Sequence, residues 1–123
     1  MRPTDSELEI LHVLWQQGPR TVRQVNDELG QQREIGYTTT LKLMQIMHEK
    51  GLLTRSEEAK SHVYTAALGE QEVQQTMIDR FLETTFRGSA SQLVMQVLGR
   101  HRASSDELDE IKKLLNNLDN EAD

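Results

Sequence analysis

An amphipathic helix is predicted by residues 37–51, YTTTLKLMQIMHEKG. Gly51 can adopt the left-handed backbone conformation that commonly follows a helix, so the helix should run from Tyr37 to Lys50. Its apolar residues should face inward, and these are Leu41, Leu43, Met44, Ile46 and Met47. Polar residues spaced by three or four positions should line the opposite side, and these are Thr38, Lys42, Gln45 and Glu49, with Thr39 beside them.

Two shorter helices are expected before this one. The first should cover residues 5–17, because Thr4 and Glu7 form a capping box in which each side chain accepts from the other residue's backbone N–H. The second should begin after a similar pair, Thr21 and Gln24. Apolar residues recur at three- and four-residue intervals in both segments, so each helix should have one buried face.

A β-hairpin with a long tip is predicted after this helical segment. Residues 52–55 and 62–66 are short runs suited to strands, and the polar residues 56–61 separate them. Three short helices followed by a hairpin are typical of a winged helix-turn-helix. This module should end near Leu68.

Three further helices are expected in residues 69–123. Arg87-Gly88-Ser89 should end the first of them, and Ser104 and Glu107 should cap the last. The polar end, residues 119–123, is expected to be frayed. Helices of this size cannot cover so much apolar surface by themselves, so pairing with a second copy of the chain would bury it. The residues expected at this dimer interface are Phe81, Leu93, Val94, Val97, Leu108, Ile111, Leu114 and Leu115.

The predicted fold is therefore mainly α, with a winged helix-turn-helix in residues 1–68 and a C-terminal helical dimerisation region in residues 69–123. The formal net charge of −6 is unevenly divided between these two parts. The first part holds eight basic and nine acidic side chains, whereas the second holds six and eleven. The N-terminal part is nearly neutral, which is compatible with DNA binding but is not evidence for it. For DNA binding, the positions of the basic groups matter more than the net charge.

The composition excludes several classes of protein. The chain has no cysteine, which excludes disulfides, thiolate metal sites and cysteine nucleophiles. No apolar run approaches the roughly 18 residues needed to span a bilayer, and the N-terminus is polar, so we expect a cytoplasmic protein without membrane insertion. The four histidines lack the spacing of metal ligands, and no phosphate-binding loop or nucleophile motif is present. We therefore expect no enzymatic activity, no metal and no cofactor.

The polar side of the helix over residues 37–50 is the strongest candidate for a functional surface. In a helix-turn-helix, the second helix of the pair places its N-terminal residues against base edges in the major groove. Threonine, lysine and glutamine all have groups that can recognise those edges. The candidate base-contacting residues are Tyr37, Thr38, Thr39, Lys42 and Gln45. The same spacing is equally compatible with ordinary solvated positions.

Basic residues elsewhere in the module are candidates for phosphate contacts. Those near the second helix are Arg20, Arg23 and Arg33, and those beside the hairpin tip are Arg55 and Lys60. Each phosphate contact would steepen the salt dependence of binding by roughly one unit of log K against log salt. Glu57 and Glu58 would repel phosphate, so the tip should either stand away from DNA or turn these two side chains outward.

Several segments together resemble the penicillinase repressors, the family of β-lactamase and methicillin-resistance repressors. In the N-terminal part they are residues 8–15 (LEILHVLW), 37–41 (YTTTL), 50–53 (KGLL) and 62–64 (HVY). In the C-terminal part they are residues 86–89 (FRGS), 93–94 (LV) and 105–111 (SDELDEI). The resemblance spans nearly the whole chain, and the combination is more specific than any single segment.

The resemblance implies a homodimer that recognises an inverted-repeat operator and blocks transcription. The wing would lie on the DNA backbone, and the C-terminal helices would hold the partner. In several members a membrane sensor-protease responds to β-lactam, and repression ends when the repressor is cut within the dimerisation helices. A membrane sensor-protease is thus a candidate partner, with the matching position near Gln96 and Val97.

The chain departs from the family pattern at three places. It lacks the asparagine-phenylalanine pair that staphylococcal-type members carry at the cleavage position, and it lacks the C-terminal cysteine motif of copper-responsive members. Ile46 and Glu49 stand where many relatives have basic residues. The first two departures argue against cleavage at the same bond and against copper sensing, and the third bears on which DNA sequence is bound and how tightly.

A second interpretation of the same pattern is a winged-helix module that binds another protein and does not bind DNA. This interpretation is open because a fold does not determine function. The nearly neutral N-terminal part and the acidic hairpin tip favour this alternative. The threonine-, lysine- and glutamine-bearing helix face and the dimerising tail favour DNA.

Overall fold

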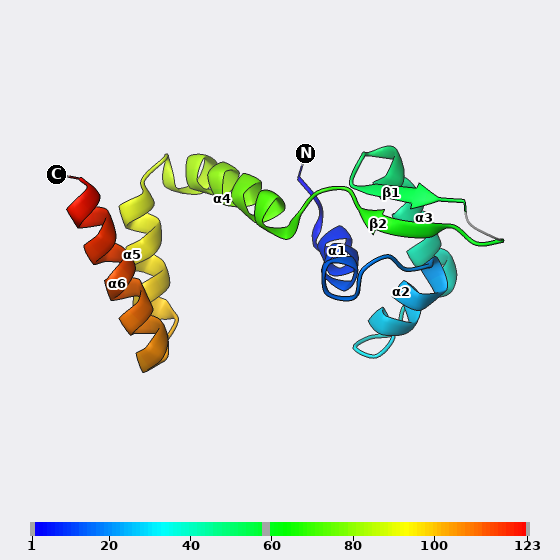
Figure 1. Ribbon diagram of the computed structural model, residues 1–123, viewed down its shortest axis with the longest axis horizontal. Coiled ribbons are helices and arrows are strands. Elements are labelled where there is room, and N and C mark those ends of the chain that lie inside the picture. Colours follow the sequence, from blue (N-terminus) through cyan, green and yellow to red (C-terminus); the bar gives the residue numbers. More distant parts are fainter. Residues whose placement is uncertain (1, 58–59, 123) are drawn as a thin grey trace. The chain divides into compact units, whose positions relative to one another are not determined.

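A computed structural model of the chain describes residues 2–57 and 60–122 (Figure 1). Within these ranges the elements follow one another as α1 (Asp5–Gln17), α2 (Val22–Leu29), α3 (Tyr37–Glu49), β1 (Leu53–Ser56), β2 (Val63–Ala66), α4 (Glu70–Phe86), α5 (Ala90–Arg100) and α6 (Ser105–Glu121). The mainly helical winged helix-turn-helix fold predicted from the sequence is confirmed. None of the helices in the described ranges has both the length and the apolarity needed to cross a lipid bilayer.

The helix starts follow the capping pairs that the sequence predicts. Oγ1 of Thr4 accepts from the backbone N–H of Glu7 at 3.2 Å, and the Glu7 carboxylate accepts from the backbone N–H of Thr4 at 2.8 Å. Thr21 with Gln24, and Ser104 with Glu107, form the same reciprocal pairs. A cap of this kind stabilises a helix by about 1 kcal/mol, and three of the six described helices begin with such a reciprocal pair.

The chain divides into two compact units, Met1–Ile78 and Asp79–Asp123. The first unit contains the three helices and the hairpin of the winged helix together with the beginning of α4. Its core consists of apolar side chains from α1, α2, α3 and the hairpin, and the most deeply buried include Ile10, Leu11, Val25, Met44, Met47, Leu52, Leu53 and Tyr64. On α4, Val73 is 3% exposed, so the first turn of this helix also packs within the first unit.

The hairpin is a two-stranded antiparallel sheet in which Leu53 pairs with Ala66 and Ser56 with Val63. Its strands begin one residue later than the sequence predicts. A further bridge joins Arg20, in the segment before α2, to Tyr64 of β2 through backbone hydrogen bonds of 3.0 and 2.8 Å. The start of α2 is therefore tied to the hairpin through the backbone.

The predicted inward face of α3 is wrong at one position. Met44 and Met47 are fully buried and Leu41 and Leu43 are half-buried, but Ile46 is 38% exposed. The fully buried residue in the first turn is instead Thr40. Because each residue of a helix advances by about 100°, Thr40 lies between Met44 and Met47 around the helix axis, whereas Ile46 lies on the side facing away.

The second unit contains the end of α4 together with α5 and α6. Arg87 has φ +53° and Gly88 has φ +84°, so these residues end α4 where the sequence predicts. Ser89 caps α5, because its hydroxyl accepts from the backbone N–H of Gln92 at 3.3 Å. The prediction of a frayed end from residue 119 is wrong for the described residues, because α6 continues to Glu121. Asp123, which the same prediction covered, lies outside the described residues.

Candidate nucleic-acid interface

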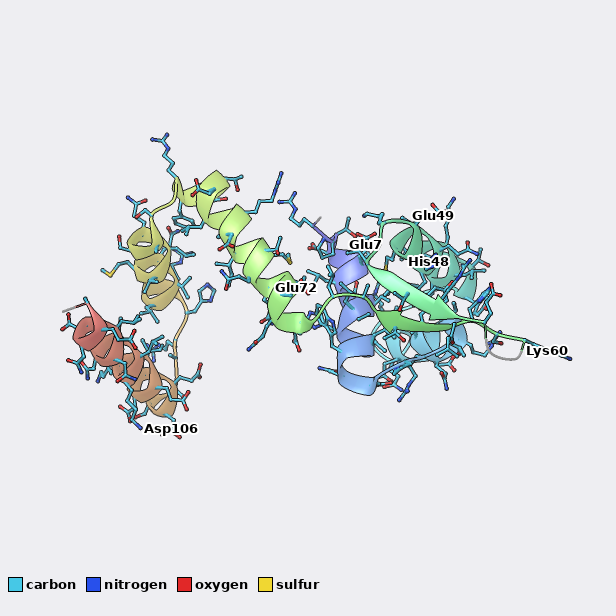
Figure 2. The ribbon with its side chains drawn as sticks, turned by 45° about the horizontal axis from the view of Figure 1, so that its top comes forward. Glu7, His48, Glu49, Lys60, Glu72 and Asp106 are labelled. Carbon is cyan, nitrogen blue, oxygen red and sulfur yellow. The ribbon has the colours of Figure 1, made fainter. Side chains whose placement is uncertain are left out.

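The outer face of α3 carries exposed polar side chains. Thr38, Thr39, Lys42 and Gln45 are all exposed, on the side of the helix opposite the buried Met44. Glu49 and Ile46 lie on the same exposed side, and Figure 2 labels Glu49 at the end of the helix. The structure thus places the predicted base-contacting residues where an approaching molecule can reach them, while their role in DNA binding stays a prediction.

The start of α3 is held by a polar contact from α2. The side-chain amide of Asn26 lies 2.7 Å from Oγ1 of Thr40, and the same amide position is 3.2 Å from the carbonyl oxygens of Ile35 and Gly36. Carbonyl oxygens only accept hydrogen bonds, so the amide nitrogen of Asn26 must face them. No side chain caps the N–H groups at the start of α3, and Asn26 instead donates to the carbonyl oxygens that precede the helix.

The end of α3 is held by an ion pair with α1. Nζ of Lys50, the residue that follows α3, lies 3.0 and 2.9 Å from the two carboxylate oxygens of Glu7, which is 2% exposed. Figure 2 labels Glu7 on α1. Burial by itself raises the pKa of Glu7, but hydrogen bonds from Thr4 and Lys50 and the charge of Lys50 outweigh it and lower the pKa below its usual value. Contacts at both ends therefore fix α3 within the first unit.

The basic residues near α2 are oriented by their neighbours. The guanidinium group of Arg23 stacks over the ring of Tyr37, 4.8 Å from its centroid. The guanidinium group of Arg20 donates to the carbonyl oxygen of Pro19 at 2.8 Å. Arg33 forms an exposed ion pair with Glu9 at 3.1 Å. Of the three arginines, Arg23 is therefore the one joined directly to the start of α3.

The hairpin carries the other two predicted phosphate contacts. Arg55 is exposed on β1, and Lys60 is exposed at the outer end of the hairpin (Figure 2). Glu57 is also exposed. Glu58 lies outside the described residues, so the expectation that Glu57 and Glu58 both turn outward concerns a position that the structure does not describe.

A pocket of about 310 Å³ lies between the start of α2, the start of α3 and the hairpin. We call it the basic pocket. It is lined by Thr21, Val22, Arg23, Tyr37, Leu41, Lys60, Ser61, His62 and Tyr64. It brings together three residues that the sequence predicts separately, Arg23, Tyr37 and Lys60. Arg20, Lys42, Gln45 and Arg55 are not among its lining residues.

Sequence reasoning missed the residues that position α3. Asn26 and Thr40 could have been found from helical spacing, because Asn26 follows Val22 by four residues on the buried side of α2 and Thr40 shares its side of α3 with Met44. The Glu7–Lys50 pair joins residues 43 positions apart, and no local pattern predicts it. Ser61 and His62 line the basic pocket because the hairpin places them beside α2 and α3, and no sequence pattern predicts that placement.

The family model of the penicillinase repressor matches residues 3–117 of the chain. The chain is 28% identical over 117 residues to the transcriptional regulator BlaI of Mycobacterium tuberculosis, covering 94% of this chain and 83% of that protein. It is 21% identical over 113 residues to the methicillin resistance regulatory protein MecI of Mammaliicoccus sciuri, covering 92% of each.

Among solved structures, a MarR family protein from Bacillus stearothermophilus shares the fold, with a TM-score of 0.55, 20% sequence identity, and coverage of 99% of this chain and 76% of that one. The fold and the match over nearly the whole chain agree with the resemblance carried by the sequence segments. The chain therefore belongs to the penicillinase repressor family, whose members are transcriptional repressors of the winged-helix type.

Proposed function

We propose that the protein is a homodimeric transcriptional repressor that binds an inverted-repeat operator. In this proposal α3 enters the major groove and the hairpin lies on the DNA backbone. The observation that carries it is the exposed face of α3, on which Thr38, Thr39, Lys42 and Gln45 are all available. Family membership supports the proposal, because members are transcriptional repressors.

The dimer is proposed on the exposed apolar surface of the second unit. No residue of α5 or α6 in the described ranges is buried. Leu114 and Leu115 are 57% and 55% exposed, and Phe81 is 48% exposed. Val94, Val97 and Leu108 are exposed as well, and Leu93 and Ile111 are half-buried. Burying this surface against the same surface of a second copy stabilises both, at about 25 cal/mol for each Å² of apolar area removed from water.

We further propose that proteolysis of the C-terminal helices ends repression, with a membrane sensor-protease as the partner. Gln96 and Val97 are both exposed on α5, so this region is accessible in the monomer. A protease binds its substrate in an extended form, so α5 would have to unwind locally before cleavage. A repressor of this kind acts on chromosomal DNA in the cytoplasm, and no enzymatic activity is proposed for it.

The proposal is tested by a band-shift experiment with a duplex that carries the palindrome upstream of the protein's own operon. We expect the full chain to shift this duplex more tightly than a scrambled duplex of equal length, and more weakly as the salt concentration rises. Absence of binding at low salt, or binding that does not depend on salt, would contradict the proposal. The alternative, a winged-helix module that binds only proteins, would then stand.

A further inference from the structure

We propose that the basic pocket binds a single phosphate group. The proposal deepens the proposed function where the phosphate belongs to the DNA backbone, and to that extent rests on it. A phosphate ester of a small molecule presents the same chemistry, so the experiment below has one arm for each source.

The charges of the lining residues favour an anion. Arg23 comes from the start of α2, whereas Lys60 and His62 come from the hairpin, so the basic groups converge from two separate segments. Among the described residues that line the pocket there is no carboxylate. The described lining therefore carries two formal positive charges, from Arg23 and Lys60, although the net charge of the chain is −6.

The stacking of Arg23 on Tyr37 prepares the guanidinium group for an anion. Because Cζ of Arg23 lies 4.8 Å from the ring centroid, the attraction between the cation and the ring restrains the group. A guanidinium has several N–H groups in one plane and can donate to two oxygens of one phosphate. Lys60 supplies a second positive charge, and the hydroxyls of Thr21 and Ser61 supply further donors in the same lining.

The size and place of the pocket fit a phosphate with its sugar. A volume of about 310 Å³ lies at the lower end of the range for small-molecule pockets, about 300–1,000 Å³. Two of its residues, Tyr37 and Leu41, lie one turn apart on α3. At about 100° per residue they are next to Gln45 and Thr38 around the helix axis. A duplex that received the exposed face of α3 would thus bring its backbone past the pocket.

The DNA arm compares three variants with the wild type: Arg23→Gln, Lys60→Gln and the double variant. Since a phosphate contact contributes about 0.9 to the slope of log K against log salt, the double variant should lower that slope by about one on both operator and scrambled duplexes. Between 50 and 200 mM salt, its loss of affinity should then be about 3.5-fold smaller than that of the wild type. A decrease of about two would mean two separate phosphates and would overturn the proposal. An unchanged slope would exclude the DNA backbone as the source of the phosphate and would leave the second arm to decide.

The control for this arm is Arg102→Gln, which removes one positive charge from an exposed residue outside the first unit. Its salt slope should equal that of the wild type. Circular dichroism should show the same helix content for all four variants. If Arg102→Gln changes the slope as much as the pocket variants do, the change comes from the net charge of the protein and not from the pocket. That result would overturn the proposal.

The second arm adds inorganic phosphate to the wild type without DNA and follows the backbone amide signals by NMR. We expect the signals of Thr21, Arg23, Tyr37 and Ser61 to shift and to reach saturation. Chloride at equal ionic strength should not cause these shifts, and the double variant should not show them. If the protein shows these shifts but binds no duplex, the pocket binds phosphate and its ligand is a free phosphate ester. The proposed function would then be wrong, whereas the inference about the pocket would hold. A lowered slope without such shifts would support the DNA backbone as the source. The absence of both the lowered slope and the phosphate-induced shifts would overturn the proposal.

Discussion

The side-chain amide of Asn26 lies 2.7 Å from Oγ1 of Thr40, and this contact joins α2 to the first turn of α3. Thr40 is fully buried, so its hydroxyl has no water to bind if the amide is removed. The same amide faces the carbonyl oxygens of Ile35 and Gly36 at 3.2 Å. One side chain therefore contacts three oxygen atoms at the junction between the two helices.

We predict that Asn26→Ala and Thr40→Val each lower the free energy of unfolding by about 1–3 kcal/mol, because each leaves buried polar atoms unpaired. The double variant should lose less than the sum, since both single changes break the same contact. Urea unfolding followed by circular dichroism measures all three. Additive losses would show that the two side chains do not depend on each other.

Asn26→Asp should be more destabilising than Asn26→Ala, although aspartate has nearly the shape of asparagine. Its carboxylate oxygen would occupy the amide position and lie near two carbonyl oxygens, which it could not satisfy. The comparison uses the same urea unfolding at neutral pH. A stability of Asn26→Asp equal to that of the wild type would mean that the amide nitrogen does not face these carbonyls.

The Glu7–Lys50 pair should make stability depend on acidity. The pKa of Glu7 is lowered in the folded protein, so the unfolded chain binds its proton at higher pH. The contribution of the pair is therefore complete above the usual value of 4.5, and it is lost as the pH falls through the lower pKa of the folded state. Thermal unfolding between pH 3 and 7 should show this loss in the wild type and not in Glu7→Gln.

Lys50→Met should lower the free energy of unfolding at pH 7 by about 1–3 kcal/mol, because it removes a hydrogen-bond donor of a buried carboxylate. This penalty should shrink at lower pH, where protonated Glu7 no longer needs the charge. The control is Arg33→Gln, which breaks the exposed pair with Glu9 and should cost at most about 1 kcal/mol. Similar losses in the two variants would mean that burial of Glu7 does not matter.

Thr39→Ala and Lys42→Ala should weaken operator binding in different ways. Thr39, if it contacts a base edge, should cost about 1–3 kcal/mol at one base position and little on a scrambled duplex. Lys42, if it contacts phosphate, should weaken binding on every sequence and lower the salt slope. Band shifts on operators substituted one base pair at a time separate the two effects. Negligible losses in both variants would exclude the outer face of α3 from the interface.

Leu115→Asp should shift the protein from dimer to monomer in sedimentation equilibrium. The change places a charge within the exposed apolar surface of α6, where a partner copy would have to bury it. Operator binding should weaken as well, since linked half-sites bind with a high effective concentration. The matched control, Asn116→Asp, adds the same charge at a neighbouring exposed position away from the apolar stripe. A dimer of unchanged stability in Leu115→Asp would remove Leu115 from the interface.

Local signals in the sequence predict the elements well, and contacts between distant segments are what they miss. Capping pairs such as Thr4 with Glu7 act over three residues, and the left-handed Gly51 follows α3 as expected. In contrast, the ion pair between Glu7 and Lys50 joins residues 43 positions apart, and no local pattern predicts it.

The candidate site shows the same division. The exposed residues of α3 follow from helical spacing, because one face of a short helix must point away from the core. The basic pocket combines residues from α2, α3 and the hairpin, and its shape depends on how these segments meet. The bridge between Arg20 and Tyr64 holds the start of α2 against the hairpin through backbone hydrogen bonds. Such bonds do not depend on the side chains, so the pattern of residue types does not predict them.

Two separate sets of residues hold α3 in place and point outward from it. The first set, which anchors the helix, is Asn26, Thr40, Glu7 and Lys50. The second set, which is exposed, is Thr38, Thr39, Lys42 and Gln45. Mutations in the outward set can therefore alter what the helix recognises while thermal stability stays nearly constant. After gene duplication, two copies of such a protein could diverge toward separate regulons without first acquiring compensating changes in their interiors.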